Sequence, residues 1–380
     1  MKYQTLAIHG GKKDDSGKHS VNYPIYLSST FVQPDLEQFE EFVYSRGNNP
    51  TRNAVESLAA QLEGAEHGLA LATGMAATSL VFGLLKQGDK VLINSNVYGG
   101  TWRFVSNIFA DRGIAYETVS DFNTYDFSRI DESVRMIFLE TPSNPLLKIT
   151  DIRRITEAAK EKNILTVVDN TFLTSYFQKP LELGADIVVY SATKYYAGHS
   201  DILAGLVLVN DEQLYTRLKF LQNTLGGILS PLDSFLLTRG IRTLGLRMER
   251  HQQNALAVAK YLAGHEAVED VYYPGLESSE NYALQRSQAK GDVGVLSIRL
   301  KDSHDSKKFV KNLKIFGLAV SLGGVESLIC HPATMTHESY APELQRQIGI
   351  DEKLLRLAVG IEDIDDLTGD LEQALEKAKR

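Results

Sequence analysis

The chain has 380 residues, of which 43% are hydrophobic and 23% charged, so the composition supports a large folded core and excludes a disordered chain. Its 40 basic and 48 acidic residues give a net charge of −8 without any basic block, so we expect no nucleic-acid partner. The first residues lack the apolar core of a secretory signal, and no apolar run could span a bilayer. We therefore expect a cytoplasmic protein without a membrane partner.

A chain of this length is expected to form two domains, because single hydrophobic cores stop growing at about 250 to 300 residues. Residues 1–45 have little periodicity and many polar groups, so we expect an N-terminal arm that lies on another surface. Residues 46–235 and 236–380 are predicted to form a large and a small domain. An arm of this length indicates a homo-oligomer.

Between about residues 55 and 210, short apolar segments alternate with helix-like segments, which is typical of a parallel α/β sheet covered by helices on both faces. The expected strands are residues 67–73, 89–94, 135–140, 164–170, 186–191 and 205–210. Residues 54–64 and 151–163 have apolar spacings of three and four and end in Gly or Asn, as helices with C-terminal stops do.

After residue 235 the pattern changes to that of a smaller α+β domain. Residues 243–265 and 363–380 are predicted helices, while 293–300 and 319–324 are predicted strands. The single cysteine, Cys330, has apolar neighbours that favour a buried small hydrophobe over a nucleophile. No Cys/His cluster has metal-ligand spacing, so we expect no metal site.

Three features are predicted to meet at the carboxyl edge of the large sheet. Thr73, Gly74 and Met75 open a helix after a strand, and free amides at a helix start bind phosphate. Asp169 ends one buried strand and Lys194 follows the next. Taken singly, these features are a tight turn, a helix cap and a solvated strand end. Because parallel strands joined by one crossover end at the same edge, the acid and the amine should converge. Such a group matches the needs of pyridoxal phosphate (PLP).

The chain resembles the Cys/Met-metabolism family of PLP enzymes, the trans-sulfuration group of cystathionine γ-synthase, cystathionine β- and γ-lyases and methionine γ-lyase. The similarity covers nearly the whole chain. Its motifs include YSRGNNPTRNAVE, TGMAA, VYGGTWR, ETPSNPLLKITD, VVDNTF, YSATKY, GHSDILAG, RGIRTLGLRM, SLGGVESL, PATMTH and RLAVGIED. The resemblance implies the α/β PLP-dependent transferase fold type I, with a mostly parallel seven-stranded sheet, a smaller C-terminal α+β domain and an N-terminal arm.

The resemblance also implies how the cofactor is bound. Lys194 should bond to the cofactor aldehyde and later carry protons, Asp169 should keep the ring nitrogen protonated, and Tyr98 should stack on the ring and help the thiol to leave. The phosphate should be held by Gly74, Met75, Ser191 and Thr193 of one subunit, and by Tyr44 and Arg46 of a neighbouring subunit. The active unit is then at least a dimer, and the habit of the family favours a tetramer built from dimers.

Four further residues are expected to bind an amino-acid substrate. Arg356, with Asn144 beside it, resembles the family's site for the α-carboxylate, where a planar guanidinium suits bidentate pairing. Ser321 should steer the lysine amine. Arg103 should meet a distal carboxylate, which cystathionine has and methionine lacks.

The sequence departs from the family pattern at several positions. Val320 and Val43 stand where many relatives that act at the γ-carbon carry acidic residues, which makes the distal pocket more apolar. Gly100 replaces the cysteine that is characteristic of methionine γ-lyase, and Ala358 stands where relatives often carry serine. His337 is left out of the catalytic set, because its segment mainly shapes the pocket wall in this family.

We therefore expect a PLP-dependent lyase that cleaves L-cystathionine by γ-elimination to cysteine, 2-oxobutyrate and ammonia, with some β-elimination to pyruvate. Cystathionine β-lyase and a synthase or sulfhydrylase that acts on acylated homoserine stay open, because the same residues serve them. A cofactor-free binding protein on the same fold and a nicotinamide oxidoreductase are the alternatives from other classes. The oxidoreductase lacks its glycine fingerprint.

Overall fold

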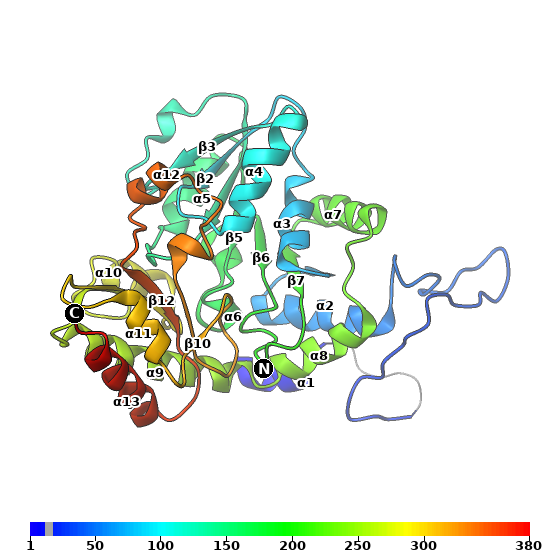
Figure 1. Ribbon diagram of the computed structural model, residues 1–380. Coiled ribbons are helices and arrows are strands. Elements are labelled where there is room, and N and C mark those ends of the chain that lie inside the picture. Colours follow the sequence, from blue (N-terminus) through cyan, green and yellow to red (C-terminus); the bar gives the residue numbers. More distant parts are fainter. Residues whose placement is uncertain (12–17) are drawn as a thin grey trace.

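The computed structural model describes residues 1–11 and 18–380, so residues 12–17 of the predicted arm lie outside it (Figure 1). Within the described residues the strands form two sheets, one of seven strands and one of five. Strands β3, β2, β4, β5 and β6 of the larger sheet run parallel, whereas β7 is antiparallel to both of its neighbours, β1 and β6. The expectation of a mostly parallel, seven-stranded sheet is confirmed.

The larger sheet has the strand order β1-β7-β6-β5-β4-β2-β3. Its strands are β1 (His67–Leu71), β2 (Lys90–Asn94), β3 (Ala115–Val119), β4 (Val134–Glu140), β5 (Leu165–Asp169), β6 (Ile187–Tyr190) and β7 (Gly205–Val209). The predicted strands all form. The edge strand β3 was not predicted, because four of its five residues are at least partly exposed and its sequence, AYETV, is half polar.

Helices cover both faces of this sheet, because successive strand residues point to opposite sides. They are α2 (Pro50–Glu63), α3 (Gly74–Phe82), α4 (Gly99–Asp111), α5 (Ile152–Lys160), α6 (Thr174–Phe177) and α7 (Glu212–Leu225). Val167 of β5 packs with α3, α4 and α7, whereas its neighbour Val168 packs with α5 on the other face. The continuous apolar runs in the sequence are thus explained by burial on both sides.

The second sheet has the order β10-β11-β12-β9-β8 and forms the smaller body at the C-terminal end (Figure 1). Its strands are β8 (Val268–Tyr272), β9 (Val295–Leu300), β10 (Gly317–Leu318), β11 (Leu328–Cys330) and β12 (Leu354–Ala358). The C-terminal part of the chain also contains α9 (Leu244–Ala263), α10 (Tyr282–Gln288), α11 (Ser306–Asn312), α12 (Pro342–Gln347) and α13 (Ile364–Lys377), whereas α8 (Pro231–Ile241) lies against α2. Cys330 is buried on β11, as expected.

One strand prediction is wrong. Residues 319–324 form a loop, and the preceding strand β10 already ends at Leu318. Ser321 and Gly323 have φ values of 99° and 76°, which are incompatible with an extended strand. The loop instead passes close to the Lys194 segment, since a Cβ atom at Gly323 would lie 2.7 Å from the amide nitrogen of Tyr195.

The N-terminal region combines a packed helix with an exposed segment. Helix α1 (Tyr3–His9) buries Ala7 and contacts α2 and α9. Farther along, the chain projects from the body before it reaches α2 (Figure 1), and Val21, Val32 and Leu36 are more than 90% exposed. The domain limits at residues 45 and 235 stay a prediction. No helix in the described ranges is long and apolar enough to cross a membrane.

Candidate active site

The carboxyl ends of β5 and β6 bring Lys194 close to Asp169. Asp169 is the last residue of β5 and pairs in parallel register with Val189 of β6, and Lys194 lies in the loop that follows β6. Burial and, to a smaller extent, the nearby Arg356 cation lower the pKa of Lys194 to about 8, although Asp169 acts in the opposite direction. An amine with such a pKa can both accept and release a proton near neutral pH.

The Asp169 carboxylate is held by its own loop. Burial raises its pKa, whereas hydrogen bonds from Thr171 and the charge of Lys194 lower it. The Thr171 amide donates to Asp169 Oδ1 at 3.0 Å, and the Thr171 hydroxyl oxygen accepts from the Ser191 amide at 2.8 Å. Thr171 therefore joins the Asp169 loop to the Ser191 loop. It was not predicted, although it lies in the VVDNTF motif.

The start of α3 packs directly on the loop after β6. The Thr73 hydroxyl caps this helix by accepting from the Ala76 amide at 2.9 Å. A Cβ atom at Gly74 would lie 2.7 Å from Ser191 Cβ, so only glycine allows this approach. The predicted phosphate residues Gly74 and Ser191 therefore meet at the N-terminus of a helix, where an anion is stabilised.

Thr193 and Met75 flank this helix start. The Thr193 hydroxyl bridges the chain, since it accepts from the Ala204 amide at 2.9 Å and donates to the Ala204 carbonyl at 3.2 Å. Met75 lies beside the loop of Tyr98. A Cβ atom at Gly100 would lie 2.8 Å from Met75 Sδ and 2.5 Å from Tyr98 Cε1. The Tyr98 ring thus folds back over Gly100, next to the start of α3.

Arg356 lies buried in the middle of β12, with only 4% of its surface exposed. Its Nη1 atom donates to Asn144 Oδ1 at 2.9 Å, and its Nη2 atom donates to the Ser321 carbonyl at 2.8 Å. Its buried Nε atom has no hydrogen-bond partner among the described residues. Because a buried polar group without a partner is costly, this donor indicates a missing anionic ligand.

These residues fit pyridoxal phosphate. Lys194 would provide the amine and Asp169 the acid for a ring nitrogen, and the contact between Gly74 and Ser191 would provide a compact anion site at a helix start. The unpaired Nε of Arg356 suits the carboxylate of an amino acid that reacts with the cofactor.

Three of the predicted site residues lie elsewhere within one chain. The Arg46 guanidinium sits 5.4 Å from the centroid of the Tyr44 ring, and its Nε donates to Asn223 Oδ1 on α7 at 3.3 Å. Arg103 is exposed on α4. None of these three residues has a described contact with Lys194, Asp169 or Arg356.

Two buried titratable residues of the site were not assigned a role from the sequence. Glu140 ends β4 and accepts from the Tyr98 amide at 2.7 Å. His337 is fully buried, and burial together with the Arg356 cation lowers its pKa to about 4. The histidine is therefore neutral at pH 7. Glu140 ends a buried strand in the same way as Asp169 does, and this shared pattern in the sequence could have pointed to it.

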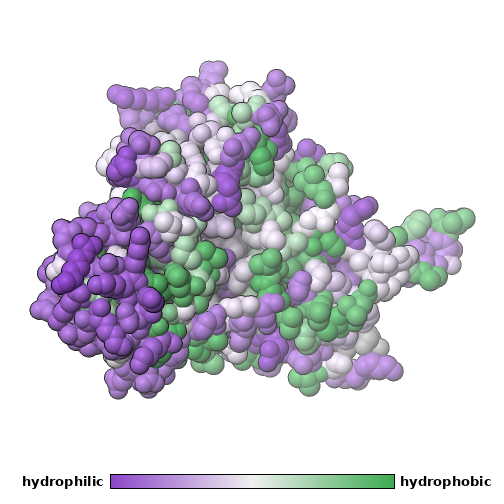
Figure 2. Space-filling model, in the orientation of Figure 1, coloured by the Kyte–Doolittle hydropathy of each residue, from purple (hydrophilic) through white to green (hydrophobic). Residues whose placement is uncertain are grey.

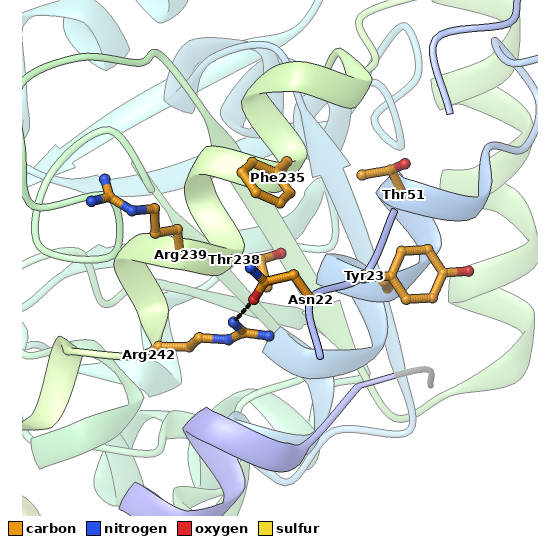
Figure 3. Close-up of a pocket in the computed structure, with 8 residues that line it drawn as sticks. Asn22, Tyr23, Thr51, Phe235, Thr238, Arg239 and Arg242 are labelled. Carbon is orange, nitrogen blue, oxygen red and sulfur yellow. Dashed lines mark hydrogen bonds between the residues drawn. The ribbon is translucent and has the colours of Figure 1, made fainter. Parts of the chain in front are cut away.

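A separate cavity of about 170 Å³ lies between the N-terminal segment, α2 and α8 (Figure 3). Arg242 donates to Asn22 across it, while the Arg239 side chain points away from Asn22 and Tyr23. None of its lining residues was predicted to be functional. The two guanidinium groups do not converge there, so the cavity lacks the geometry of an anion site.

Comparison with known proteins agrees with the geometry. The model of the family described as Cys/Met metabolism PLP-dependent enzyme matches residues 4–376, and the chain belongs to this family of pyridoxal-phosphate enzymes. This membership excludes the nicotinamide oxidoreductase and speaks against a cofactor-free binding protein.

Several relatives are similar over almost their entire lengths. A cystathionine β-lyase of Lactococcus lactis subsp. cremoris is 48% identical over 98% of this chain and 99% of the relative. A cystathionine γ-lyase of Bacillus subtilis is 46% identical over 99% of this chain and the whole relative. The crystal structure of cystathionine γ-lyase from Lactobacillus plantarum complexed with L-serine matches with a TM-score of 0.97 and 41% identity, covering 100% of this chain and 99% of that one. The fold-type expectation is thereby confirmed.

Proposed function

We propose that the protein is a cystathionine lyase that cleaves the bond between the γ-carbon and sulfur, yielding cysteine, 2-oxobutyrate and ammonia. The observation that carries this proposal is that the charges of both Asp169 and Arg356 act on the Lys194 amine, whose pKa is about 8, and that Arg356 is bonded to Asn144. The similarity to cystathionine γ-lyases of Bacillus subtilis and Lactobacillus plantarum supports the choice of reaction.

In this proposal the protein holds the substrate by its carboxylate. Arg356 donates to Asn144 and retains an unused Nε donor, so the pair can bind a planar α-carboxylate in one orientation. This orientation places the carbon atoms of the substrate on the side of Lys194. Bound PLP supplies the electron-withdrawing ring that makes the protons of these carbon atoms acidic.

Proton transfer is assigned to Lys194 Nζ. Loss of the γ-substituent requires proton removal first at the α-carbon and then at the β-carbon, and a single amine with a pKa of about 8 can serve both positions. The Tyr98 phenol, half-exposed at the start of α4, is assigned to the departing thiol. Ser321 is assigned to steering the amine, and Arg103 to a distal carboxylate.

Cleavage at the β-carbon is the second candidate. Val320 and Val43 are 56% and 41% exposed, so neither is a core residue, and both leave an apolar surface where an acidic group would favour the distal ammonium of cystathionine. The Lactococcus lactis β-lyase at 48% identity supports this candidate. A synthase reaction has support from the cystathionine γ-synthase of Xanthomonas oryzae, whose crystal structure in complex with cystathionine matches with a TM-score of 0.94.

We further propose that active sites are shared between copies of the chain. Tyr44 is half-exposed. The Arg46 guanidinium lies over the Tyr44 ring and donates to Asn223 on α7. Both side chains therefore lie at the surface of one chain, where a neighbouring subunit can reach them. Apolar areas cover the projecting segment and the middle of the face in Figure 2, whereas the small domain is hydrophilic. An apolar face of this kind favours a dimer, and two dimers would form the expected tetramer.

The test is product identification. Purified protein loaded with PLP is incubated with L-cystathionine, and the ketoacid is identified by chromatography against authentic standards. The proposal predicts 2-oxobutyrate as the main product. Pyruvate as the main product would assign the β-lyase reaction instead, and cystathionine formed from an acylated homoserine and cysteine, without ketoacid release, would assign the synthase.

A further inference from the structure

Glu140 lies next to Asp169, the acid assigned to the cofactor ring. The proposed function gives Glu140 itself no role. It ends β4 and pairs in parallel register with Asp169, the last residue of β5. In-register residues of neighbouring strands point to the same face, so the two carboxyl groups share one side of the sheet. Glu140 is only 5% exposed. A second buried carboxyl group beside Asp169 costs free energy unless its contacts repay it.

The contacts of Glu140 come from two segments of the site. Its Oε2 atom accepts from the Tyr98 amide at 2.7 Å. The backbone of Asn144 lies near the same carboxyl group. Burial raises the pKa of this group, and the Asn144 backbone lowers it. Its own amide donates to Asn94 Oδ1 at 2.8 Å, which fixes the end of the strand. The carboxyl group therefore connects the backbone that carries Tyr98 with the backbone that carries Asn144.

Nearby groups reinforce this connection from the outside. The His337 ring faces the main chain of both Val97 and Asn144, and the Tyr340 hydroxyl donates to the Val97 carbonyl at 3.1 Å. Arg356 donates to the Asn144 side chain, and its charge lowers the pKa of Glu140. The Tyr98 segment and the Asn144 segment thus both lie beside Glu140, and residues 337–340 also pack against both segments.

We infer that Glu140 is a positioning residue that holds Tyr98 and Asn144 in register through their backbone amides, an inference that rests on the assignment of Asn144 and Arg356 to the substrate carboxylate. Without an acceptor at this position, the Tyr98 amide loses its partner and the Asn144 backbone loses a polar neighbour, so the loops that carry both side chains shift. The carboxylate site of the substrate is then misaligned, although neither Arg356 nor Asn144 has changed.

The test compares Glu140→Leu with a matched control, Asp370→Leu. Asp370 is also 5% exposed and accepts backbone amides, from Lys314, Ile315 and Phe316, but it lies on α13 of the small domain. Both variants should lower the thermal midpoint of the PLP-loaded enzyme. Only Glu140→Leu should weaken the binding of glycine, which has an α-carboxylate and no leaving group, by about tenfold in a titration of the cofactor absorbance.

The conservative variant Glu140→Gln keeps one acceptor oxygen and should restore most of the glycine affinity. If Glu140→Leu does not yield folded enzyme, Glu140→Asp, whose shorter side chain withdraws the acceptor, should show the same weakening. The inference would be overturned if glycine affinity were unchanged in Glu140→Leu and Glu140→Asp, or reduced equally in Asp370→Leu. Because glycine binding does not depend on cystathionine cleavage, this result is separate from that of the product test.

Discussion

Lys194 carries the strongest prediction at the scale of single residues. Lys194→Ala should still bind PLP through the contacts around Gly74 and Ser191, but turnover of the substrate should fall by about three orders of magnitude or more, since the proton carrier is lost. The check is steady-state ketoacid release together with the PLP content after dialysis. Turnover close to that of the wild type would contradict the role assigned to the amine.

Arg356 tests the geometry of the carboxylate site. Arg356→Lys keeps the charge but cannot reach both Asn144 Oδ1 and the Ser321 carbonyl while presenting a planar donor pair. The KM for the amino-acid substrate should rise by about tenfold or more, with a smaller change in the affinity for PLP. Kinetics over a range of substrate concentrations measure this, and an unchanged KM would argue for a purely structural arginine.

The contact between helix α3 and the loop after β6 is the critical feature at the scale of secondary-structure elements. Gly74→Ala would place a methyl group 2.7 Å from Ser191 Cβ, so the helix start must move away from the loop. The affinity for PLP should fall by about tenfold as the anion site opens. Fluorescence titration of the cofactor-free protein with PLP measures the change.

Gly369 is the matched control for this substitution. It lies within α13, and a Cβ atom there would meet nothing within 4 Å. Gly369→Ala should therefore leave the affinity for PLP unchanged and stabilise the helix by about 0.5–1 kcal/mol. Equal losses of affinity in both variants would show that the α3 contact has no specific part in cofactor binding.

The sharing of active sites between subunits is a property of the whole molecule. Lys194→Ala and Arg46→Ala should each be nearly inactive. Lys194→Ala lacks the proton carrier, and Arg46→Ala lacks the side chain proposed to bind the cofactor phosphate in the neighbouring subunit. After the two variants are mixed, dissociated and reassembled, random dimers should regain about a quarter of the wild-type activity, since half of them contain one intact site. No recovery, in a mixture that chromatography shows to have exchanged subunits, would refute the shared site.

Stability should depend on pH through a carboxyl group that has no assigned part in the reaction. Glu63, at the end of α2, is fully buried and accepts from the Tyr190 hydroxyl at 2.5 Å, and burial raises its pKa to about 8. The folded protein then binds this proton more tightly than the unfolded chain. The contribution of Glu63 to stability is therefore fully present below its ordinary pKa and is lost as the pH rises through 8.

Glu63→Gln should remove this dependence, because the amide does not titrate. The thermal midpoint of the variant, minus that of the wild type, should increase between about pH 5 and pH 8.5 at fixed protein and PLP concentrations. A difference that stays constant over this range would show that Glu63 is not protonated in the folded protein.

The sequence alone was enough to predict where the amine and the acid of the candidate site lie. Continuous apolar runs marked the buried strands, and two such runs in succession placed Asp169 and Lys194 at one edge of the sheet, as the register of β5 and β6 confirms. Local patterns also marked the helix start at Gly74 and the long helix α9. These features could be predicted because they depend on spacing along the chain and on the parallel connection of strands.

The tertiary structure decided the features that depend on distant segments. The Arg356 site combines β12, the Asn144 loop and the Ser321 loop, and the predicted strand at 319–324 gives way to a loop because it must pass against the Lys194 segment. Glu140 acquires its contacts only when β4 comes to lie beside β5 and the Tyr98 loop folds over it. A local pattern records which face of an element is apolar, whereas the partner of a buried polar group is fixed only by the packing of the whole chain.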